Sequence, residues 1–409
     1  MIRCRPSRTL LLAVFTIVVA APGLAACGSS PSPAPTVTVT VSPSSSASPS
    51  SSPTATKPAV KKQLAIAVAS GSAANGVSVI GSAGQVKQLV APHGGPIRDL
   101  AWSPDGTRLA YVQAKSVSVF AGRLWVYDTS TGKASQIIFP NEDQEAVADG
   151  FTWVGATQLV VSVIGSGPPY RANGAMWVID VAKHTQKTMK DTAGHIVLGA
   201  SPTASADGML VAFVHYSKVT GGKIPEKLLL YDADTLAVSE VAHGEAYADI
   251  DSDAFSFPSL SPDGSLVYTC QTGSDPGFRC TVYRVDGSKA YVSPPLIWPT
   301  DGAWDAKGTR LAFGGLNSAA YSGYTSGDVI NVWLAGSSKA STILHYGRPD
   351  AWLGSLAWTP LGKQIVYTVP LASGSNGDIW VVNADGTNKH KLLHNGSHPA
   401  CAEAPIKFP

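Results

Sequence analysis

The nearest approach to a metal site in this sequence is a run of three carboxylates at alternate positions, Asp249, Asp251 and Asp253. Hard cations such as Ca²⁺ bind oxygens of this kind, but an EF-hand loop also needs further oxygen ligands and a glycine, which this run lacks. We therefore interpret the run as a solvated loop that leads into a strand, and we predict no metal and no cofactor. Metal binding by these carboxylates is the weaker alternative.

Three histidines near the C-terminus, His390, His394 and His398, are spaced four residues apart. They fall in a predicted strand and turn, and an extended chain separates such residues by about 13 Å per step. That separation is too large for one metal ion. We interpret all three as solvated side chains.

Other catalytic motifs are absent from the sequence. It contains no Gly-x-Ser-x-Gly nucleophile elbow, no His-Glu-x-x-His, no Cys-x-x-Cys and no glycine-rich phosphate loop. Charged residues are 14% of the chain and the formal net charge is +2. This balance predicts no basic surface for nucleic acid.

The stretch 101–112 has the pattern of two short strands joined by a tight turn. Pro104 sets φ for a type I turn, Asp105 can cap its own backbone, and Gly106 supplies the positive φ that closes the bend. Apolar residues on both sides, among them Trp102, are typical of paired strands. The stretch alone predicts one hairpin.

This hairpin pattern recurs at intervals of 49, 53, 56, 44 and 54 residues between turn glycines. The turn glycines are Gly106, Gly155, Gly208, Gly264, Gly308 and Gly362. A second repeat runs in phase, and in it an apolar strand ends in a turn former. Its segments are 124–128, 176–180, 228–232, 282–286, 332–336 and 379–383. A period of this length, with short strands and no helical run, is typical of β-propeller blades, each of four strands A to D.

These units resemble the WD40-like PD40 repeats of the TolB family, whose pattern is Trp-Ser-Pro-Asp-Gly, then an apolar strand, then Ile-Tyr-Val-x-Asp. The segments 102–106 and 124–128 show both halves of that pattern. The resemblance covers the chain from about residue 62 to the end. It implies a β-propeller fold, work in the cell envelope and contact with other proteins.

The predicted fold of residues 61–409 is all-β, a β-propeller of seven four-stranded blades, whereas TolB has six. The segments 64–68, 76–80 and 85–90 match strands B, C and D without a strand A, and 398–408 can supply that strand. A blade made from both termini would close the ring and leave no open sheet edge. Six blades with an irregular N-terminal extension is the alternative.

The N-terminal residues 1–26 have the pattern of a signal peptide. Arginines precede an apolar run, 10–21, which is too short to span a membrane. The following Leu-Ala-Ala-Cys resembles a bacterial lipobox, in which the cysteine, here Cys27, receives a diacylglyceryl group and becomes the mature N-terminus. An ordinary cleaved signal followed by a chance cysteine is the alternative.

Residues 27–60 have the composition of an extended tether rich in serine, proline, threonine and alanine. A segment with so few large apolar side chains cannot bury enough surface to fold, and its prolines keep it extended. Lipid anchor and tether together predict a protein held on the extracytoplasmic face of the cell membrane. Such a tether suggests a single-membrane, Gram-positive-type lipoprotein, whereas TolB is a free periplasmic protein.

Two cysteines, Cys270 and Cys280, are predicted to lie on neighbouring strands B and C of one blade. Antiparallel neighbours place such Cα atoms about 4.5 to 5.5 Å apart, which is within reach of a disulfide. Outside the cytoplasm a bridge is favoured, with two unpaired core cysteines as the alternative. Cys4 is removed with the signal, and Cys401 is left over.

The predicted B–C loops are long, whereas the A–B and C–D turns on the opposite face are short. Tyrosine, phenylalanine and arginine among glycine and serine are typical of binding surfaces, and function collects on loops held by a rigid scaffold. Loops that are merely tolerated in length are the alternative. The candidate binding residues are Tyr170, Arg171, Tyr216, Phe278, Arg279, Tyr321 and Tyr324.

We therefore predict a monomeric, lipid-anchored β-propeller that binds a protein or glycan partner of the envelope and does no chemistry. The alternative is a lyase or glycosidase with carboxylates and histidines at the central channel. The carboxylates of 249–253 are its only sequence support. Because one fold hosts many functions, the fold alone does not decide between the two.

Overall fold

Residues 65–402 and residue 406 are described by the computed structural model, apart from twelve gaps. The gaps are residues 72, 82–83, 115–121, 140–146, 165–172, 219–222, 248–254, 272–278, 298, 318–327, 346–352 and 371–376. The chain divides into two units, Met1–Ala59 and Val60–Pro409, and every described residue lies in the second. The predicted signal peptide 1–26 and tether 27–60 lie outside the described residues.

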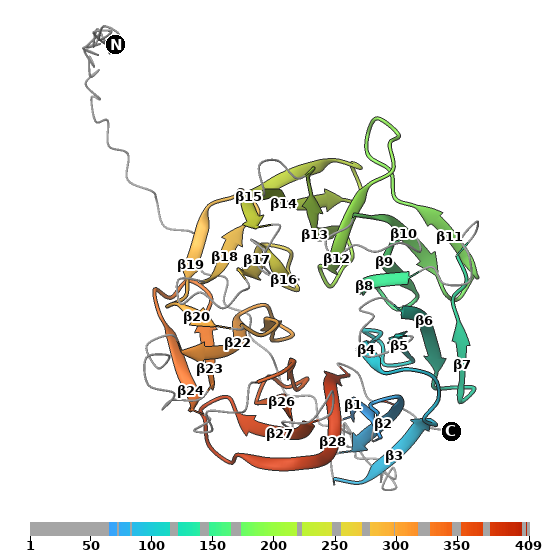
Figure 1. Ribbon diagram of the computed structural model, residues 1–409, viewed down its shortest axis with the longest axis vertical. Helices are drawn as coiled ribbons and strands as arrows, with labels where there is room; N and C mark the ends of the chain where they lie inside the picture. The colour runs from blue at the N-terminus through green and yellow to red at the C-terminus, as the bar shows by residue number, and fades with distance from the viewer. Residues whose placement is uncertain are drawn as a thin grey trace, which may run out of the picture. The chain divides into compact units, whose positions relative to one another are not determined.

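The described part of the second unit is all-β: its elements are strands in antiparallel pairs, with no α-helix among them. No helix within it is therefore long and apolar enough to cross a membrane. The strands form consecutive meanders around a common centre, with strand A innermost and strand D at the rim (Figure 1). This arrangement is a β-propeller.

The strands are named here by their place in each meander. The A strands are β4 (Ile97–Trp102), β8 (Val147–Val154), β12 (Leu198–Ala204), β16 (Ser256–Leu260), β21 (Ala303–Trp304), which the short β20 (Leu296–Ile297) precedes, and β25 (Leu356–Trp358). The B strands are β1 (Ala65–Ser70), β5 (Arg108–Ala114), β9 (Gln158–Ile164), β13 (Leu210–Tyr216), β17 (Leu266–Cys270), β22 (Arg310–Asn317) and β26 (Gln364–Pro370). The C strands are β2 (Gly76–Gly81), β6 (Gly122–Asp128), β10 (Gly174–Asp180), β14 (Lys223–Asp232), β18 (Cys280–Arg284), β23 (Asp328–Leu334) and β27 (Gly377–Asn383). The D strands are β3 (Val86–Val90), β7 (Lys133–Gln136), β11 (Thr185–Thr188), β15 (Val238–Tyr247), β19 (Lys289–Val292) and β24 (Ala340–His345).

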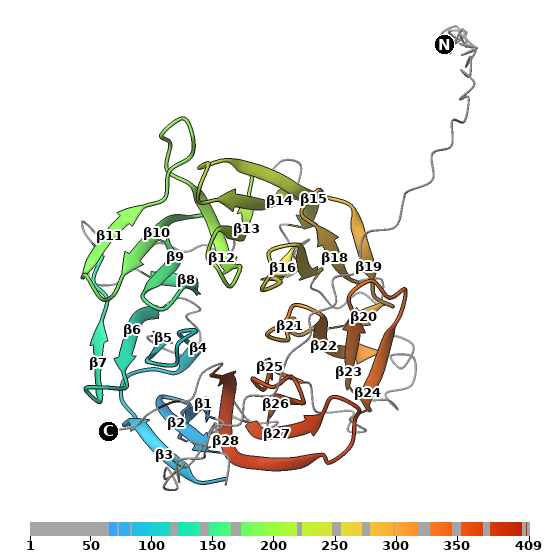
Figure 2. The ribbon, with the colours of Figure 1, turned by 180° about the vertical axis from the view of Figure 1, so that it is seen from behind.

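The last strand, β28 (His390–Cys401), belongs to two meanders. Its first half pairs with β27, placing His390 opposite Val381. Its second half pairs with β1, placing Ala400 opposite Ala67. Figures 1 and 2 show this strand running from the rim toward the centre. This one strand therefore serves as strand D of the last meander and as strand A beside β1. The sequence predicted that strand A at 398–408.

The predicted A–B turn is confirmed at 103–108. The Ser103 amide donates to the Arg108 carbonyl at 2.8 Å, and the Ser103 hydroxyl donates to Asp105 Oδ1 at 2.6 Å. Gly106 has φ 69°, a conformation that glycine adopts without strain. The same serine–aspartate hydrogen bond recurs between Ser205 and Asp207 and between Ser261 and Asp263.

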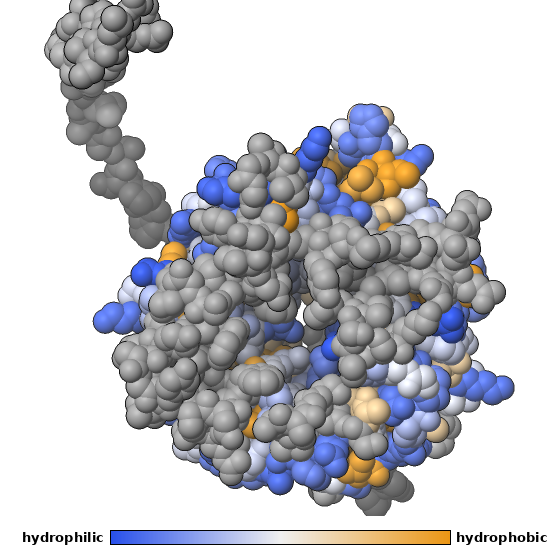
Figure 3. Space-filling view, in the orientation of Figure 1, coloured by the Kyte–Doolittle hydropathy of each residue, from blue (hydrophilic) through white to orange (hydrophobic). Residues whose placement is uncertain are grey.

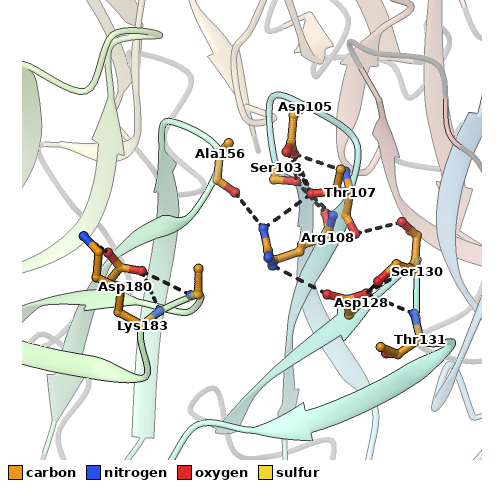
Figure 4. Close-up of polar contacts among 12 residues, drawn as sticks. Ser103, Asp105, Thr107, Arg108, Asp128, Ser130, Thr131, Ala156, Asp180 and Lys183 are labelled. Carbon is orange, nitrogen blue, oxygen red and sulfur yellow. Dashed lines mark hydrogen bonds and ion pairs between the residues drawn. The ribbon is translucent and has the colours of Figure 1, made fainter.

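The A–B and C–D turns emerge side by side on one face, which we call the short-turn face (Figure 4). Arg108 connects them, because its Nε lies 3.8 Å from Asp128 Oδ2 in the C–D turn. Its Nη1 donates to the Ala156 carbonyl in the A–B turn of the next meander, at 3.4 Å. The opposite ends of the B and C strands, which flank the predicted B–C loops, define the opposite face, which we call the B–C face.

The hydrophobic core lies in layers between neighbouring meanders. In one layer Leu109 and Tyr111 of β5 pack with Val77 and Val79 of β2. The opposite face of β5 packs in a separate layer, against β9. Each B strand is therefore buried on both faces, which explains its nearly continuous apolar sequence.

Tryptophans connect neighbouring A strands through their indole nitrogens. Trp153 Nε1 donates to the Ala101 carbonyl at 2.9 Å, Trp304 Nε1 to that of Ser259 at 3.0 Å, and Trp358 Nε1 to that of Ala303 at 2.8 Å. Each bond links an A strand to the one before it. Trp102 of β4 occupies the same place, but its buried Nε1 has no hydrogen-bond partner among the described residues.

Candidate functional site

Five of the A strands share an irregularity at one position near the centre. In β4 the pairing register shifts between Ile97 and Asp99, and comparable shifts occur in β8, β12, β16 and β28. When the A strands are aligned by their pairing with the B strands, the bulged position lies three residues before the tryptophan position. We call the residues at this position the central ring. They are Asp99, Gly150, Ser201, Phe257, Asp301, Ser355 and His398.

The backbone at the central ring places neighbouring members close together. Gly150, Ser201 and His398 all have positive φ, at 100°, 51° and 49°. A Cβ atom at Gly150 would lie 3.3 Å from the Cα of Ser201. The repeat therefore presents one equivalent residue per A strand to the same region, although the residue types differ.

Two carboxyl groups of the central ring have raised pKa values. Burial raises the pKa of Asp99 to about 7, and repulsion from Asp301 adds to this, whereas the Leu100 amide partly offsets it. Burial also raises the pKa of Asp301, to about 6. Both side chains keep some solvent exposure although protein surrounds them. A carboxyl with such a pKa can give or take a proton at neutral pH.

The histidine of the central ring, His398, is neutral at physiological pH. Burial lowers its pKa to about 4, and the charge of Arg98 contributes in the same direction. His390 and His394 are exposed, and His394 Nδ1 lies 2.6 Å from Asp378 Oδ1. The interpretation of all three histidines as solvated therefore does not fit His398, whose side chain is half-buried and has a lowered pKa.

Metal binding finds no support within the described residues. No three His, Cys, Asp or Glu side chains in that part of the chain are grouped closely enough to hold a metal ion. The candidate ligands Asp249, Asp251 and Asp253 lie outside the described residues.

Two of the candidate binding residues are described, Tyr216 and Arg279. Tyr216 ends β13 on the B–C face, and the side chain of Asn173 fixes its backbone: Asn173 Nδ2 donates to the Tyr216 carbonyl at 2.6 Å, and the Tyr216 amide donates to Asn173 Oδ1 at 2.8 Å. Arg279 is exposed directly before β18. The remaining candidates lie outside the described residues, namely Tyr170, Arg171, Phe278, Tyr321 and Tyr324.

A cavity of 240 Å³ lies along one face of the meander β16–β19, from Gln271 and Arg279 at its B–C end to Lys289 next to its C–D turn. Its lining residues are Phe255, Thr269, Gln271, Arg279, Thr281, Tyr283, Lys289 and Val292. The rings of Phe255 and Tyr283 meet edge to face, with centroids 6.4 Å apart. Of this set only Arg279 was predicted from the sequence, although polar residues at alternate positions of β17 and β18 were a usable signal.

Cys270 and Cys280 form a disulfide beside this cavity, with their Sγ atoms 2.02 Å apart. They face each other in the register of β17 and β18, and both are buried. The bridge holds together the two strand ends that carry Gln271 and Arg279. Cys401 is a free thiol, and burial raises its pKa to about 12, so it stays protonated.

Comparisons with known proteins support the fold. An oligogalacturonate lyase in complex with manganese is 15% identical, with a TM-score of 0.55 over 81% of this chain and 85% of that one. The oligogalacturonate lyase of Vibrio parahaemolyticus is 13% identical, with a TM-score of 0.52 over 81% and 85%. At such identities the likeness shows a shared β-propeller fold and nothing finer.

TolB from Acinetobacter baumannii is 15% identical, with a TM-score of 0.46 over 83% of this chain. The chain spans 66% of that protein's length. No protein-family model matches the sequence, and no curated protein matches it.

Proposed function

We propose that this protein is a lipoprotein, anchored through Cys27 to the extracytoplasmic face of the cell membrane, whose β-propeller binds a protein or glycan of the envelope. The binding surface is the B–C face. The observation that carries this proposal is the cavity along the meander β16–β19, which includes Gln271 and Arg279 at the B–C face and an aromatic pair. The TolB-like repeats of the sequence agree with a role in binding rather than in catalysis.

The proposal includes a ring of seven blades closed by strands from both termini. Pairing of β28 with both β27 and β1 supports it, because the C-terminal strand then completes the meander that begins at β1. Contacts between successive A strands, including β28 with β4, support it too. A closed ring would hold the B–C loops at fixed positions and so favour binding.

The hydrophilic surface of the described residues agrees with a polar binding partner. The described surface in Figure 3 is mainly hydrophilic, with hydrophobic side chains in separate patches. The two most exposed large apolar residues in the described part, Leu361 and Ile138, belong to different meanders. Polar and charged contacts would then supply specificity, with few aromatic anchors.

Site-specific photocrosslinking in the cells that make the protein tests which face binds. A photoreactive phenylalanine analogue replaces Tyr216 or Gln271 on the B–C face, and Ser130 or Thr131 on the short-turn face serves as the matched control. We expect one discrete adduct from both B–C positions and none from the control positions. Adducts from the control positions alone would contradict the proposal.

An enzyme with its site at the central ring is the second candidate. Asp99 and Asp301 favour it, because carboxyls with raised pKa values occur at catalytic sites. The likeness to oligogalacturonate lyases suggests acidic glycans as substrates. The described residues do not fit the manganese of that lyase, because no three metal-binding side chains are grouped among them.

Incubation of the full chain with oligogalacturonate, with and without Mn²⁺, separates the two candidates. Binding without product, detected by chromatography of the oligosaccharides, agrees with a scaffold. Product that disappears in the Asp99→Asn variant would instead establish the enzyme.

A further inference from the structure

The connection between β11 and β12, residues 189–197, projects beyond the outer strands of the propeller (Figures 1 and 2). We call it the rim loop. The Asp191 amide donates to the His195 carbonyl at 2.9 Å, and the Gly194 amide donates to the Asp191 carbonyl, also at 2.9 Å. Asp191 Oδ1 accepts from the amides of Ala193 at 3.0 Å and His195 at 2.8 Å. The backbone of the rim loop is therefore held by its own hydrogen bonds.

Two large apolar side chains at the base of the rim loop face solvent. Ile196 is 48% exposed and Leu198 is 45% exposed. Val197 between them is buried in a core layer with Met189 and Met176. Alternate residues of an extended chain point to opposite sides, so Ile196 and Leu198 share the outer side. Figure 3 shows a hydrophobic patch at the base of this projection.

The charge beside this apolar pair is positive on balance. Lys187 and Lys190 are both exposed, and neither side chain forms an ion pair with any residue in the described ranges. Lys190 lies opposite Ile196 in the bridge that closes the loop. Asp191 is the one carboxylate of the segment 187–198, and it faces the loop's own amides and, at 3.4 Å, His195 Nδ1. An apolar pair flanked by lysines complements a partner that is anionic outside and apolar inside.

The size and shape of this surface favour a lipid bilayer over a protein as that partner. A stable protein interface buries about 800 Å² on each side, and two side chains on a projecting loop offer far less. A headgroup layer accepts a projection, because apolar side chains enter it while lysine side chains reach back to its surface. The proposed anchor at Cys27 would hold the loop near such a layer at high effective concentration, so a weak contact suffices.

We propose that the rim loop inserts Ile196 and Leu198 into the surface of an anionic bilayer, with Lys187 and Lys190 at the lipid phosphates. This inference rests on the proposed function, because it takes the membrane as the place where the protein is held. Since the loop projects from the rim, insertion would stand the propeller on its edge and leave the B–C face open to its partner.

A polarity-sensitive fluorophore, nitrobenzoxadiazole, attached to an Ala193→Cys variant tests the insertion. Ala193 is exposed in the rim loop. Cys270 and Cys280 are joined in a disulfide, and Cys401 stays protonated, so these native cysteines do not compete for the label. Labelling of the native chain measures the background. Leu361→Cys is the matched control, because Leu361 is an exposed apolar residue in an A–B turn on the short-turn face.

The labelled full chain is purified in detergent and incorporated into vesicles of phosphatidylcholine, with or without phosphatidylglycerol. We expect the emission of the probe at Ala193 to rise at least twofold in vesicles that contain phosphatidylglycerol, because the probe leaves water for the headgroup layer. The probe at Leu361 should keep the emission that it has in water.

Further substitutions in the chain labelled at residue 193 separate the two contributions. Ile196→Ser combined with Leu198→Ser should abolish the rise, whereas Leu361→Ser should leave it intact. Lys187→Gln combined with Lys190→Gln should make the emission equal in the two kinds of vesicle. Thermal midpoints establish that all variants are folded.

No rise at Ala193 in a chain that is attached to the vesicles would overturn the inference. So would an equal rise at Leu361, or a rise that requires added envelope proteins, which would indicate a protein partner instead. Flotation of the vesicles separates this inference from the proposed function. A chain that floats without a rise disproves the contact of the rim loop alone, and a chain that neither floats nor shows a rise disproves the anchor as well.

Discussion

At the scale of single residues, the central ring carries different functional groups at structurally equivalent positions of the repeat. Asp99, Ser201 and His398 occupy the same place in three A strands. Their backbones share the bulge, yet one is a carboxyl, one a hydroxyl and one an imidazole. Fold symmetry therefore places these groups, and the sequence of each repeat decides what they do.

The carboxyl of Asp99 should make stability fall as pH rises. Its folded pKa of about 7 lies above the unfolded value of about 4, so its contribution is fully present below about pH 4 and is lost as pH rises through about 7. Asp99→Asn removes this loss. We expect the variant to be more stable than the native chain at pH 8, by roughly 1 to 3 kcal/mol, and similar to it at pH 4.

Urea unfolding at both pH values measures this effect. Asp385→Asn is the control with the opposite sign, because hydrogen bonds from Thr387 hold the pKa of Asp385 below its usual value. That variant should lose stability at neutral pH. No gain for Asp99→Asn at pH 8 would mean that the Asp99 carboxyl is well hydrated.

The imidazole of His398 should have the opposite effect and make stability fall as pH decreases. Its folded pKa of about 4 lies below the unfolded value of about 6.5, so its contribution is present above about 6.5 and is lost as pH falls toward 4. His398→Asn should flatten this acid-side loss. Asparagine is suitable because φ is 49° at this position, a conformation that asparagine tolerates. Unfolding midpoints at pH 5 and pH 7 should differ less in the variant than in the native chain.

At the scale of elements, local patterns predicted most strands and turns but not the inner bulges. The A–B turn of Ser103–Asp105 and the pairing of Cys270 with Cys280 follow from short-range rules of turn chemistry and strand adjacency. The bulge at His398 has no such signal, because the residue with positive φ there is not a glycine. The place of His398 in the central ring was therefore missed.

The tryptophan hydrogen bonds between A strands should make a measurable contribution to the free energy of unfolding. Trp153 Nε1 donates to the Ala101 carbonyl, whereas the buried Nε1 of Trp102 has no partner. Both side chains are 7% exposed, so Trp→Phe removes similar packing in each. We expect Trp153→Phe to cost about 1 kcal/mol more than Trp102→Phe, measured by chemical unfolding. Equal costs would show that these bonds contribute no net stability.

The C-terminal segment should stabilise the fold far more than the tether does. Deletion of 399–409 removes the pairing of Ala400 with Ala67 and the buried side chains of Ala402 and Ile406. We expect a loss of at least about 3 kcal/mol. Deletion of 28–60 removes a segment predicted to pack against nothing and should leave the thermal midpoint unchanged. An unchanged midpoint after the C-terminal deletion would contradict closure by β28 and favour six blades.

At the scale of the whole molecule, the cavity as a unit was not predicted, because its walls come from several strands of one meander that meet only on folding. Phe255, Thr269 and Lys289 are far apart in the sequence and meet only through sheet pairing. No repeat pattern marks them, since the other meanders have different residues there. Arg279 alone was found, because it borders a long loop.

Membrane attachment should depend on one cysteine. Cys27→Ala removes the only acylation site that the lipobox pattern predicts, and acyl chains supply the free energy of anchoring. We expect the variant to leave the membrane fraction or to remain unprocessed. Cys401→Ala is the control and should stay with the membrane. Membrane partitioning of a processed Cys27→Ala variant would disprove the lipid anchor.

The pairing of β1 with β28 also determines when the fold can be completed during synthesis of the chain. β1 is among the first strands to leave the ribosome, and the strand that covers its inner edge is the last. Until residue 401 is available, that edge keeps unpaired N–H and C=O groups, and the apolar face beside it lacks its neighbour. A growing chain therefore cannot complete this pairing, and in the proposed export it would reach the membrane incompletely folded. Under that proposal, the final pairing of β1 with β28 would form only after the C-terminus has crossed the membrane.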